Sequence, residues 1–271
     1  MNTPNTPLNL PEPPLNYRIN ALTGAATGTA RELSAPLSAE IAAALAASPN
    51  GEIAVRSVDL NIPLLEKNDI LAERNRGYFL GRGLAALNLV SSPGAGKTTL
   101  LERTLDEFGR QTKCAVLVGD LETDNDGRRL SRPHAPVAQI TTGTVCHLDA
   151  GMIARAAQSI NLDGVRVLFI ENVGNLVCPA SFDLGEQVRV VLLSTTEGED
   201  KPLKYPPIFK SAHLVLLTKV DVADVLGFKR DIAVENIRRI APQAKIIQLS
   251  ARTGEGLPEW YSFLKSLTGQ G

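Results

Sequence analysis

Residues 91–99 read Ser-Ser-Pro-Gly-Ala-Gly-Lys-Thr-Thr, directly after the apolar run Ala85–Val90. A buried strand, a glycine-containing loop and a Lys-Thr helix start in this order are typical of a phosphate-binding loop. Gly94 and Gly96 allow backbone N–H groups to turn inward around a polyphosphate without a side chain in the way. Ser91 stands where the strict pattern has Gly, but it lies at the strand end, so we expect the loop to keep its form. The loop predicts a binding site for a nucleoside triphosphate.

The charged and hydroxyl groups near this loop predict how the phosphates and Mg²⁺ would be held. Lys97 places a positive charge on the outer phosphates, and the Thr98 hydroxyl can ligate Mg²⁺. Asp120 and Glu171 follow two further apolar runs, so their carboxylates are the candidates for holding Mg²⁺ directly or through water. Glu171-x-x-Gly174 resembles the switch loop whose Gly N–H senses the terminal phosphate. We expect the nucleotide to be bound by the loop residues Gly94, Ala95, Gly96, Lys97, Thr98 and Thr99, and hydrolysis to depend on Lys97, Asp120 and Glu171. No Gln is placed to orient water, so we expect slow intrinsic turnover.

A second motif predicts that the base is guanine. The apolar run Leu214–Leu217 ends in Thr218-Lys219-Val220-Asp221. Guanine presents N1–H and an exocyclic amine as neighbouring donors, and one carboxylate, that of Asp221, can accept from both. Adenine lacks this pair of donors, and mismatches of this kind are rejected by factors on the order of 10⁴. The Lys219 stem is expected to cover the base, and a backbone N–H of Ser250-Ala251 to donate to guanine O6. Thr218 stands where such loops most often have Asn, so we expect a weaker tie to the phosphate-binding loop.

Length and charge exclude several other classes of function. The chain has 271 residues with 28 basic and 29 acidic side chains, so it lacks the basic surplus of a nucleic-acid-binding protein. No apolar run approaches the roughly 18–20 residues of a membrane span. Three widely spaced cysteines do not make a disulfide framework, which indicates a reducing compartment. We therefore expect a cytoplasmic protein.

Apolar runs that alternate with helical patterns predict an α/β fold, a mostly parallel sheet with helices on both faces. The expected strands are Ala85–Val90, Cys114–Gly119, Ala138–Thr141, Val165–Ile170, Val188–Leu193, Leu214–Leu217 and Lys245–Leu249. The expected helices are Ser38–Ala47, Pro63–Leu80, Thr98–Phe108, Ala150–Ile160, Ile232–Ile240 and Pro258–Leu267. Residues 1–50 are Pro- and Ala-rich and are expected to be largely disordered. We expect residues 51–84 to form a helical segment packed on a nucleotide-binding domain of residues 85–271.

Two cysteines and a histidine suggest a metal site. Cys146-His147 lies between an expected strand and an expected helix, and Cys178 lies four residues after Gly174. Thiolate and imidazole suit Zn²⁺ and Ni²⁺. Three ligands are one short of a closed tetrahedral site, which leaves room for a ligand shared across a symmetric dimer or for metal transfer. By spacing alone the alternative of buried, structural cysteines stays open.

Taken together, these motifs resemble the hydrogenase nickel-incorporation GTPase family (HypB), which belongs to the SIMIBI class of P-loop GTPases. The resemblance extends from about Asn61 to Leu267. The strings that carry it, in order, are 91–99, 119–124, 142–150, 171–179 and 204–206. The Cys-His-Leu-Asp-Ala and Glu-Asn-Val-Gly-Asn-Leu-Val-Cys-Pro strings are far more specific than the phosphate-binding loop.

This resemblance implies a GTP-hydrolysing metallochaperone that helps to deliver nickel to [NiFe]-hydrogenase. It implies a GTP-dependent homodimer whose interface holds Ni²⁺ or Zn²⁺ at positions matching Cys146, His147 and Cys178. It also implies two partners, a small zinc-containing nickel chaperone (HypA-like) and the hydrogenase large-subunit precursor. Some members carry a Cys- or His-rich nickel motif near the N-terminus, but this chain has no Cys or His before Cys114.

Because Cys178 continues the segment that begins at Glu171, we expect nucleotide state to set the position of one metal ligand. The alternatives are a urease-type nickel-delivery GTPase, a P-loop kinase or biosynthetic ATPase acting on a small metabolite, and a passive zinc protein with a vestigial nucleotide site. Asp221 argues against an ATP-dependent kinase. The adjacent Cys146-His147 differs from the Cys-x-His spacing of the urease type.

Overall fold

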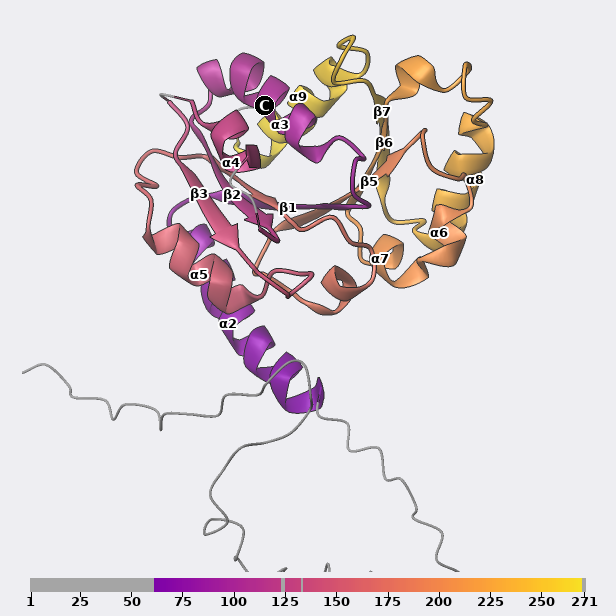
Figure 1. Cartoon of the computed structure of the whole chain (residues 1–271). Coiled ribbons are helices and arrows are strands. Elements are labelled where there is room, and N and C mark those ends of the chain that lie inside the picture. Colours follow the sequence, from indigo (N-terminus) through magenta and orange to yellow (C-terminus); the bar gives the residue numbers. More distant parts are fainter. Residues whose placement is uncertain (1–60, 123–124, 133, 270–271) are drawn as a thin grey trace, which may run out of the picture. The chain divides into compact units, whose positions relative to one another are not determined.

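A seven-stranded parallel sheet organises the part of the chain that the structure, a computed structural model, describes: residues 61–122, 125–132 and 134–269. The strand order is β3-β2-β4-β1-β5-β6-β7 (Figure 1). The strands are β1 (Ala85–Ser91), β2 (Cys114–Asp120), β3 (Val137–Thr141), β4 (Val167–Glu171), β5 (Val188–Ser194), β6 (Leu214–Thr218) and β7 (Lys245–Leu249). Because all neighbours run parallel, the carboxyl ends of the strands share one edge, where ligands bind in sheets of this kind.

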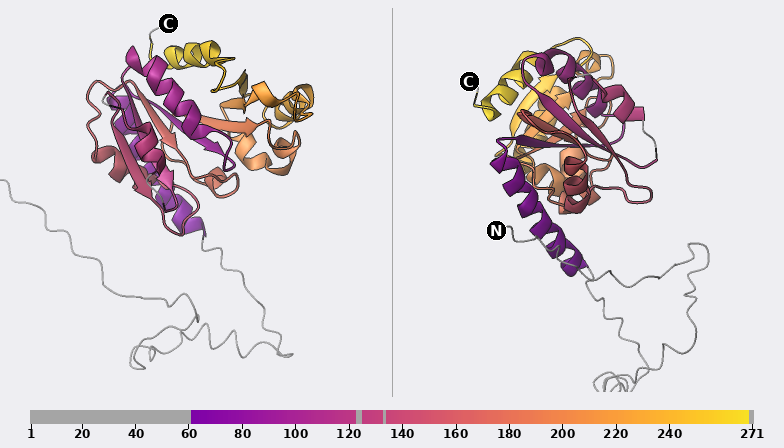
Figure 2. Two further views of the ribbon diagram at one scale, coloured as in Figure 1. Left: turned by 45° about the horizontal axis from the view of Figure 1, so that its top comes forward. Right: turned by 90° about the vertical axis from the view of Figure 1, so that its left-hand side faces the viewer.

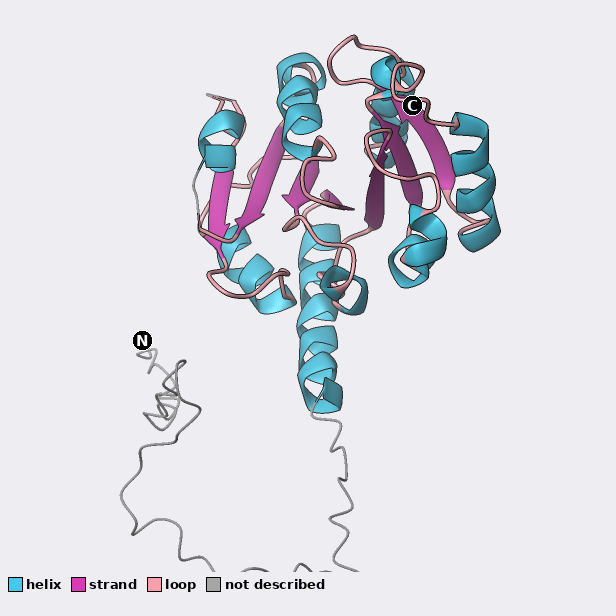
Figure 3. Ribbon diagram, turned by 45° about the vertical axis from the view of Figure 1, so that its right-hand side comes forward, coloured by secondary structure: helices cyan, strands magenta, loops and turns pink. Residues whose placement is uncertain are grey.

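Helices cover both faces of this sheet (Figure 3). They are α2 (Asn61–Gly81), α3 (Lys97–Glu107), α4 (Asn125–Leu130), α5 (Ala150–Gln158), α6 (Lys201–Lys204), α7 (Pro206–Lys210), α8 (Arg230–Ile240) and α9 (Leu257–Leu267), with short 3₁₀ turns η1 (Phe108–Arg110), η2 (Cys178–Ser181) and η3 (Val220–Val222). Among the residues described, no helix has both the length and the apolar character needed to cross a membrane.

The sheet separates the apolar core into layers. On one face, α3 and α9 pack on β1, β2, β6 and β7, with Trp260 fully buried among them. On the other face, α2 and α5 pack on β1, β2 and β4, while α7 and α8 pack on β5 and β6. Accordingly α2 and α9 lie on opposite sides of the sheet (Figure 2). Continuous apolar strands suit this arrangement because both of their faces are covered.

The predicted fold class is confirmed, and the differences are local. The strand predicted from Val165 begins at Val167, since Val165 belongs to the turn that Val165 N closes on Leu162 O. The short helices α4, α6 and α7 were not predicted, because four to six residues are too few for a helical period to emerge. The predicted helix Ser38–Ala47 and the extension 1–50 lie outside the described residues.

Candidate functional site: a nucleotide groove beside a thiol–imidazole cluster

The phosphate-binding loop has the predicted form. Gly94 and Gly96 have φ of 75° and 100°, values that L side chains rarely adopt. Gly96 forms the N-terminal cap of α3, and its carbonyl accepts the first helical hydrogen bond from Leu100 N at 2.9 Å. The free N–H groups at the start of α3 therefore face the carboxyl edge of the sheet, as anion binding requires.

Ser91, which replaces the expected Gly, has a definite role in this loop. It is fully buried, and its Oγ accepts a hydrogen bond from Lys97 Nζ at 2.9 Å. Burial lowers the pKa of Lys97, an effect opposed by the carboxylate of Glu171. The Lys97 ammonium is thus held inside the groove, with Ser91 as its partner.

Glu171 and Thr98 lie together at the bottom of the groove. Thr98 Oγ1 donates to Glu171 Oε1 at 2.6 Å, whereas Glu171 Oε2 is buried without a hydrogen-bond partner. Burial raises the pKa of Glu171 to about 7. A buried carboxylate oxygen without a partner, next to a hydroxyl, fits a site for Mg²⁺, which prefers oxygen ligands.

Two other predicted residues line the same groove. Asp120 ends β2, and its Oδ1 accepts from Leu121 N at 2.6 Å. Gly174 lies against the phosphate-binding loop: a Cβ there would come within 3.0 Å of the Cα of Pro93. Glycine makes this close approach possible without displacing Pro93, so the segment after β4 lies directly against the loop. The sequence did not reveal Asp126, Arg129 and Asn172 as lining residues of the groove.

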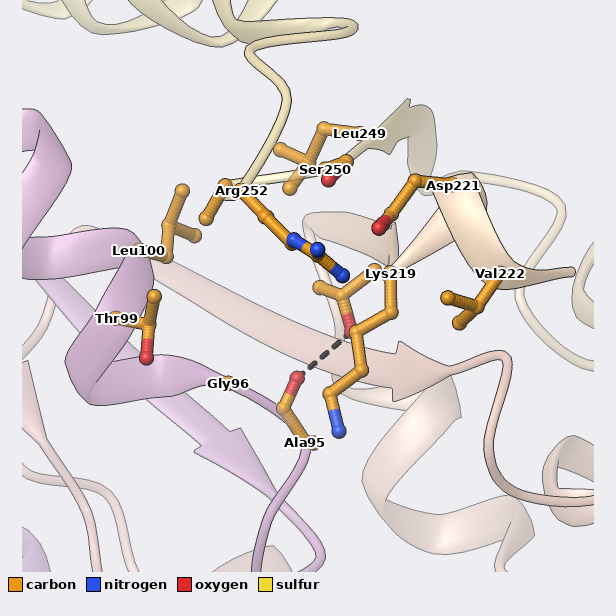
Figure 4. Close-up of a pocket in the computed structure, with 12 residues that line it drawn as sticks. Ala95, Gly96, Thr99, Leu100, Lys219, Asp221, Val222, Leu249, Ser250 and Arg252 are labelled. Carbon is orange, nitrogen blue, oxygen red and sulfur yellow. Dashed lines mark hydrogen bonds between the residues drawn. The ribbon is translucent and has the colours of Figure 1, made fainter.

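A separate cavity of about 220 Å³ opens beside the groove, and it brings together the residues predicted to recognise the base. Its walls include the predicted residues Lys219, Asp221, Ser250 and Ala251. Arg252, which was not among the predicted base-binding residues, also lines it. In Figure 4 the Asp221 carboxylate and the Arg252 side chain point into the cavity from opposite sides. Gly96, Thr99 and Lys219 line both the cavity and the groove. The two spaces are therefore adjacent, as a base and its phosphates require.

The base loop is tied firmly to the phosphate-binding loop, contrary to the expectation of a weaker tie. Thr218 Oγ1 donates to Ala95 O at 2.8 Å, and this bond is buried. Lys219 is the only non-glycine residue with positive φ (60°) within the described part of the chain. Its carbonyl accepts from Thr195 Oγ1 at 2.7 Å. A hydroxyl at 218 thus makes the connection for which an amide was expected.

Cys146, His147 and Cys178 form a cluster in which one ligand atom from each lies within 4.8 Å of the others. The two thiols are 3.1 Å apart. The hydrogen bond between them, together with partial burial, raises the pKa of the Cys146 thiol. Asn175 Nδ2 donates to Cys146 O at 3.1 Å, which connects the segment 171–178 to the strand-to-helix segment that holds Cys146. The sequence spacing could not place these three side chains together, and the fold does.

His147 is held as a neutral ring. Burial lowers its pKa, its ring stacks on Phe182 with centroids 3.9 Å apart, and its Nδ1 is buried without a hydrogen-bond partner. Asp149, two residues later, caps α5 by accepting from Met152 N at 2.7 Å, which fixes the chain that follows the ring. A neutral imidazole beside two thiols is a donor set for a borderline metal ion.

Comparison with known proteins places the chain in a family. Residues 85–248 match the family described as "CobW/HypB/UreG, nucleotide-binding domain". The hydrogenase maturation factor HypB of Escherichia coli strain K12 is 51% identical over 211 residues, which cover 78% of this chain and 73% of the relative. This chain belongs to the HypB family.

Two further HypB relatives bear on the function. The Helicobacter pylori protein described as "Hydrogenase/urease maturation factor HypB" is 40% identical over 219 residues, covering 79% of this chain and 90% of that protein. A crystal structure of HypB from Helicobacter pylori in complex with nickel superposes with a TM-score of 0.71 at 40% identity. It covers 75% of this chain and 96% of that one. The family therefore consists of nucleotide-binding maturation factors, and one of its members has been crystallised in complex with nickel.

Proposed function

We propose that this chain is a GTP-hydrolysing metallochaperone that controls nickel at Cys146, His147 and Cys178 for the assembly of [NiFe]-hydrogenase. The observation that carries the proposal is the position of the segment 171–178. This segment begins at Glu171 in the nucleotide groove and ends at Cys178 in the thiol–imidazole cluster.

In the proposed mechanism the guanine lies in the cavity with its N1–H and amine on Asp221, while the phosphates lie along Gly94–Thr99. Lys97 turns from Ser91 to the outer phosphates. Thr98 and Glu171, with Asp120 beside them, would hold Mg²⁺, which when bound neutralises charge on the phosphates. The terminal phosphate meets Gly174 and so fixes the position of the segment 171–178. Turnover is expected to be slow, since no glutamine is found among the described residues that line the groove.

Nickel is the cargo of this cycle. When the segment 171–178 changes position with the nucleotide, Cys178 moves relative to Cys146 and His147, and the affinity for nickel changes. We further propose a GTP-dependent homodimer around the cluster, a HypA-like zinc-containing partner, the hydrogenase large-subunit precursor as client, and a cytoplasmic location. Zn²⁺ suits the same donors as Ni²⁺.

The test is a nickel titration of the full chain in the presence of Mg-GDP and of a non-hydrolysable GTP analogue with Mg²⁺. We expect the two dissociation constants to differ by about fivefold or more. Cys178→Ala should weaken nickel binding and reduce the difference between the two nucleotide states while leaving GTP affinity unchanged, whereas Lys97→Ala should abolish phosphate release. Cys114→Ala, a change to a buried thiol outside the cluster, is the matched control. Equal affinities in both nucleotide states would reject the proposed control of nickel.

Delivery of nickel to urease is a second candidate, because one relative carries urease in its description. The two clients are distinguished by deleting the gene in its own host. Loss of hydrogenase activity that is restored by added nickel, with urease unaffected, supports the first proposal.

A further inference from the structure

A polar side chain occupies the middle of β1, where every residue is buried. Asn88 is fully buried between Leu87 and Leu89. A buried amide is unfavourable unless its donors and acceptor find partners. Asn88 Oδ1 accepts from Asn172 Nδ2 at 3.2 Å, and Asn88 Nδ2 donates to Glu186 Oε1 at 3.2 Å. These bonds join the segment after β4 to the segment before β5.

Glu186 and Arg189 continue the connection from Asn88. Arg189 Nε donates to Glu186 Oε1 at 2.8 Å, and the two side chains form a buried ion pair. Arg189 Nη2 then donates to Phe182 O at 2.9 Å. We call Asn88, Glu186 and Arg189 the buried polar frame. Phe182, which is bound by Arg189 at the far end of this frame, is the residue whose ring stacks on His147.

Helix α2 fixes this frame in place. Arg76 Nη1 donates to Glu186 O at 2.7 Å, and Asn75 Nδ2 donates to Leu184 O at 3.0 Å. Gly185 has φ of +85°, and a Cβ there would come within 2.5 Å of Ala72 O. With the backbone of residues 184–186 held this closely, the frame is a stationary support.

Asn172 stands between the frame and the metal cluster. It follows Glu171 directly and lines the nucleotide groove. Its Nδ2 donates to Asn88, while its Oδ1 accepts from Val173 N at 2.9 Å and from Leu148 N at 3.4 Å. Leu148 is the residue after His147, so one amide contacts the nucleotide segment, the frame and the chain that carries the imidazole.

We propose that Asn172 is a positioning residue that couples nucleotide state to His147, with the buried polar frame as the support on which its amide pivots. When the segment 171–174 moves with the terminal phosphate, the amide keeps its bond to Asn88 and changes its long bond to Leu148 N. His147 then shifts relative to Phe182 and the two thiols. This inference rests on the proposed function, and it adds a second, non-covalent route beside the one through Cys178.

The test compares nickel affinity in two nucleotide states, because a merely structural residue would change both equally. Nickel sulfate is titrated into the full chain with Mg-GDP or with a non-hydrolysable GTP analogue and Mg²⁺, and thiolate-to-nickel charge-transfer absorbance is followed. The measured quantity is the ratio of the two dissociation constants. For the unmodified chain we expect a ratio on the order of tenfold.

Asn88→Val removes the support without touching nucleotide or metal. We expect the ratio to fall by about threefold or more while GTP and GDP affinities stay unchanged. Thr104→Val is the matched control. Thr104 is equally buried, and its Oγ1 accepts from Trp260 Nε1 at 2.9 Å in a core layer on the opposite face of the sheet. This control should keep the full ratio.

Each outcome decides the proposal. A wild-type ratio in Asn88→Val, or equal weakening of nickel in both states, overturns the role of Asn172 and leaves the proposed function intact. A ratio of one in the unmodified chain overturns nucleotide control of nickel itself, and the present inference with it. Should Asn88→Val fail to fold, Arg189→Lys keeps a positive charge beside Glu186 but removes the guanidinium nitrogen that donates to Phe182 O. Its ratio must fall as well, and an unchanged ratio rejects the proposal.

Discussion

Single side chains carry the chemical choices in the proposed function, which assigns the choice of base to Asp221. Its carboxylate points into the cavity beside the phosphate-binding loop (Figure 4). A carboxylate accepts two hydrogen bonds but donates none, which matches the two neighbouring donors of guanine. The proposed specificity for GTP is thereby assigned to one group.

Replacing this group should change the preferred nucleotide. In Asp221→Asn the amide offers a donor and an acceptor, which matches the C2 carbonyl and the N1–H of xanthine. We expect GTP affinity to fall by about 100-fold or more and XTP to bind better than GTP, measured by displacement of a fluorescent nucleotide. Asp224→Asn, at an exposed neighbouring position, should bind GTP normally. Retention of GTP preference by Asp221→Asn would remove Asp221 from base recognition.

Glu171 makes stability depend on pH. Burial raises its pKa from 4.5 to about 7. In the absence of metal and nucleotide, and at a pH between these two values, Glu171 therefore keeps a proton in the folded chain that it has released in the unfolded chain. Because its pKa is raised in the folded state, this carboxyl lowers the stability of the fold as pH increases from about 4.5 to 7, and the full decrease in stability is reached above pH 7.

We expect Glu171→Gln to remove this part of the pH dependence. As pH rises from 5 to 8, the free energy of unfolding of Glu171→Gln should increase relative to that of the unmodified chain by on the order of 1 to 3 kcal/mol, because the amide does not ionise. Urea unfolding in EDTA without nucleotide measures the difference. Glu66→Gln, at an exposed position in α2, should behave as the unmodified chain. A Glu171→Gln variant with the same pH slope as the parent would contradict the assignment.

At the scale of elements, α2 joins parts of the chain that are distant in sequence. Asn75 Nδ2 donates to Ala150 O at 2.8 Å and to Leu184 O at 3.0 Å, and Asn68 Oδ1 accepts from Ala150 N at 2.9 Å. The helix therefore holds the start of α5, just after His147 of the thiol–imidazole cluster, and the segment before β5. A helix outside the matched family region supports both.

Truncating Asn75 should weaken the attachment of α2 to the start of α5 and to the segment before β5. Asn75→Ala leaves two buried carbonyls without their partner, which costs about 1–3 kcal/mol and lowers the melting temperature by several degrees. Nucleotide affinity should be unchanged because α2 does not line the groove. Differential scanning fluorimetry and nucleotide displacement measure the two effects. Arg74→Ala, on the exposed side of the same helix, should melt like the parent.

At the scale of the whole molecule, the nucleotide groove and the thiol–imidazole cluster share one segment, and linkage would make the influence of their ligands mutual. If the nucleotide changes nickel affinity by some factor, nickel must change the relative affinity for GTP analogue and GDP by the same factor. The two sites are joined by residues 171–178 and by the contact of Asn175 with Cys146.

We therefore expect nickel at saturation to shift the ratio of GDP to GTP-analogue dissociation constants by about fivefold or more. Fluorescent-nucleotide titration with and without nickel measures this ratio, and the shift should be smaller in Cys178→Ala. A shift that differs from the factor obtained in nickel titrations would show that a step such as dimerisation adds its own free energy.

Sequence periodicity was sufficient for the seven strands and the longer helices, since each extends over enough residues for its pattern to emerge. It was also sufficient for the phosphate-binding loop, whose chemistry lies within nine consecutive residues. The short helices were missed, and so was the hydroxyl bond from Thr218 to Ala95, because a side chain's reach in space cannot be read from its position in the chain.

The sequence by itself determined the local chemistry of this protein: a phosphate-binding loop, the carboxylate that we propose binds guanine, and two thiols with an imidazole. Only the tertiary structure decided how these parts communicate. Thr98 meets Glu171 across 73 residues of sequence, and Asn88 meets Glu186 across 98. Burial raises the pKa of Glu171, and because Asn88 is buried its amide must find its hydrogen-bond partners within the protein. Burial is a property of the packed molecule, so no string of neighbouring residues encodes it.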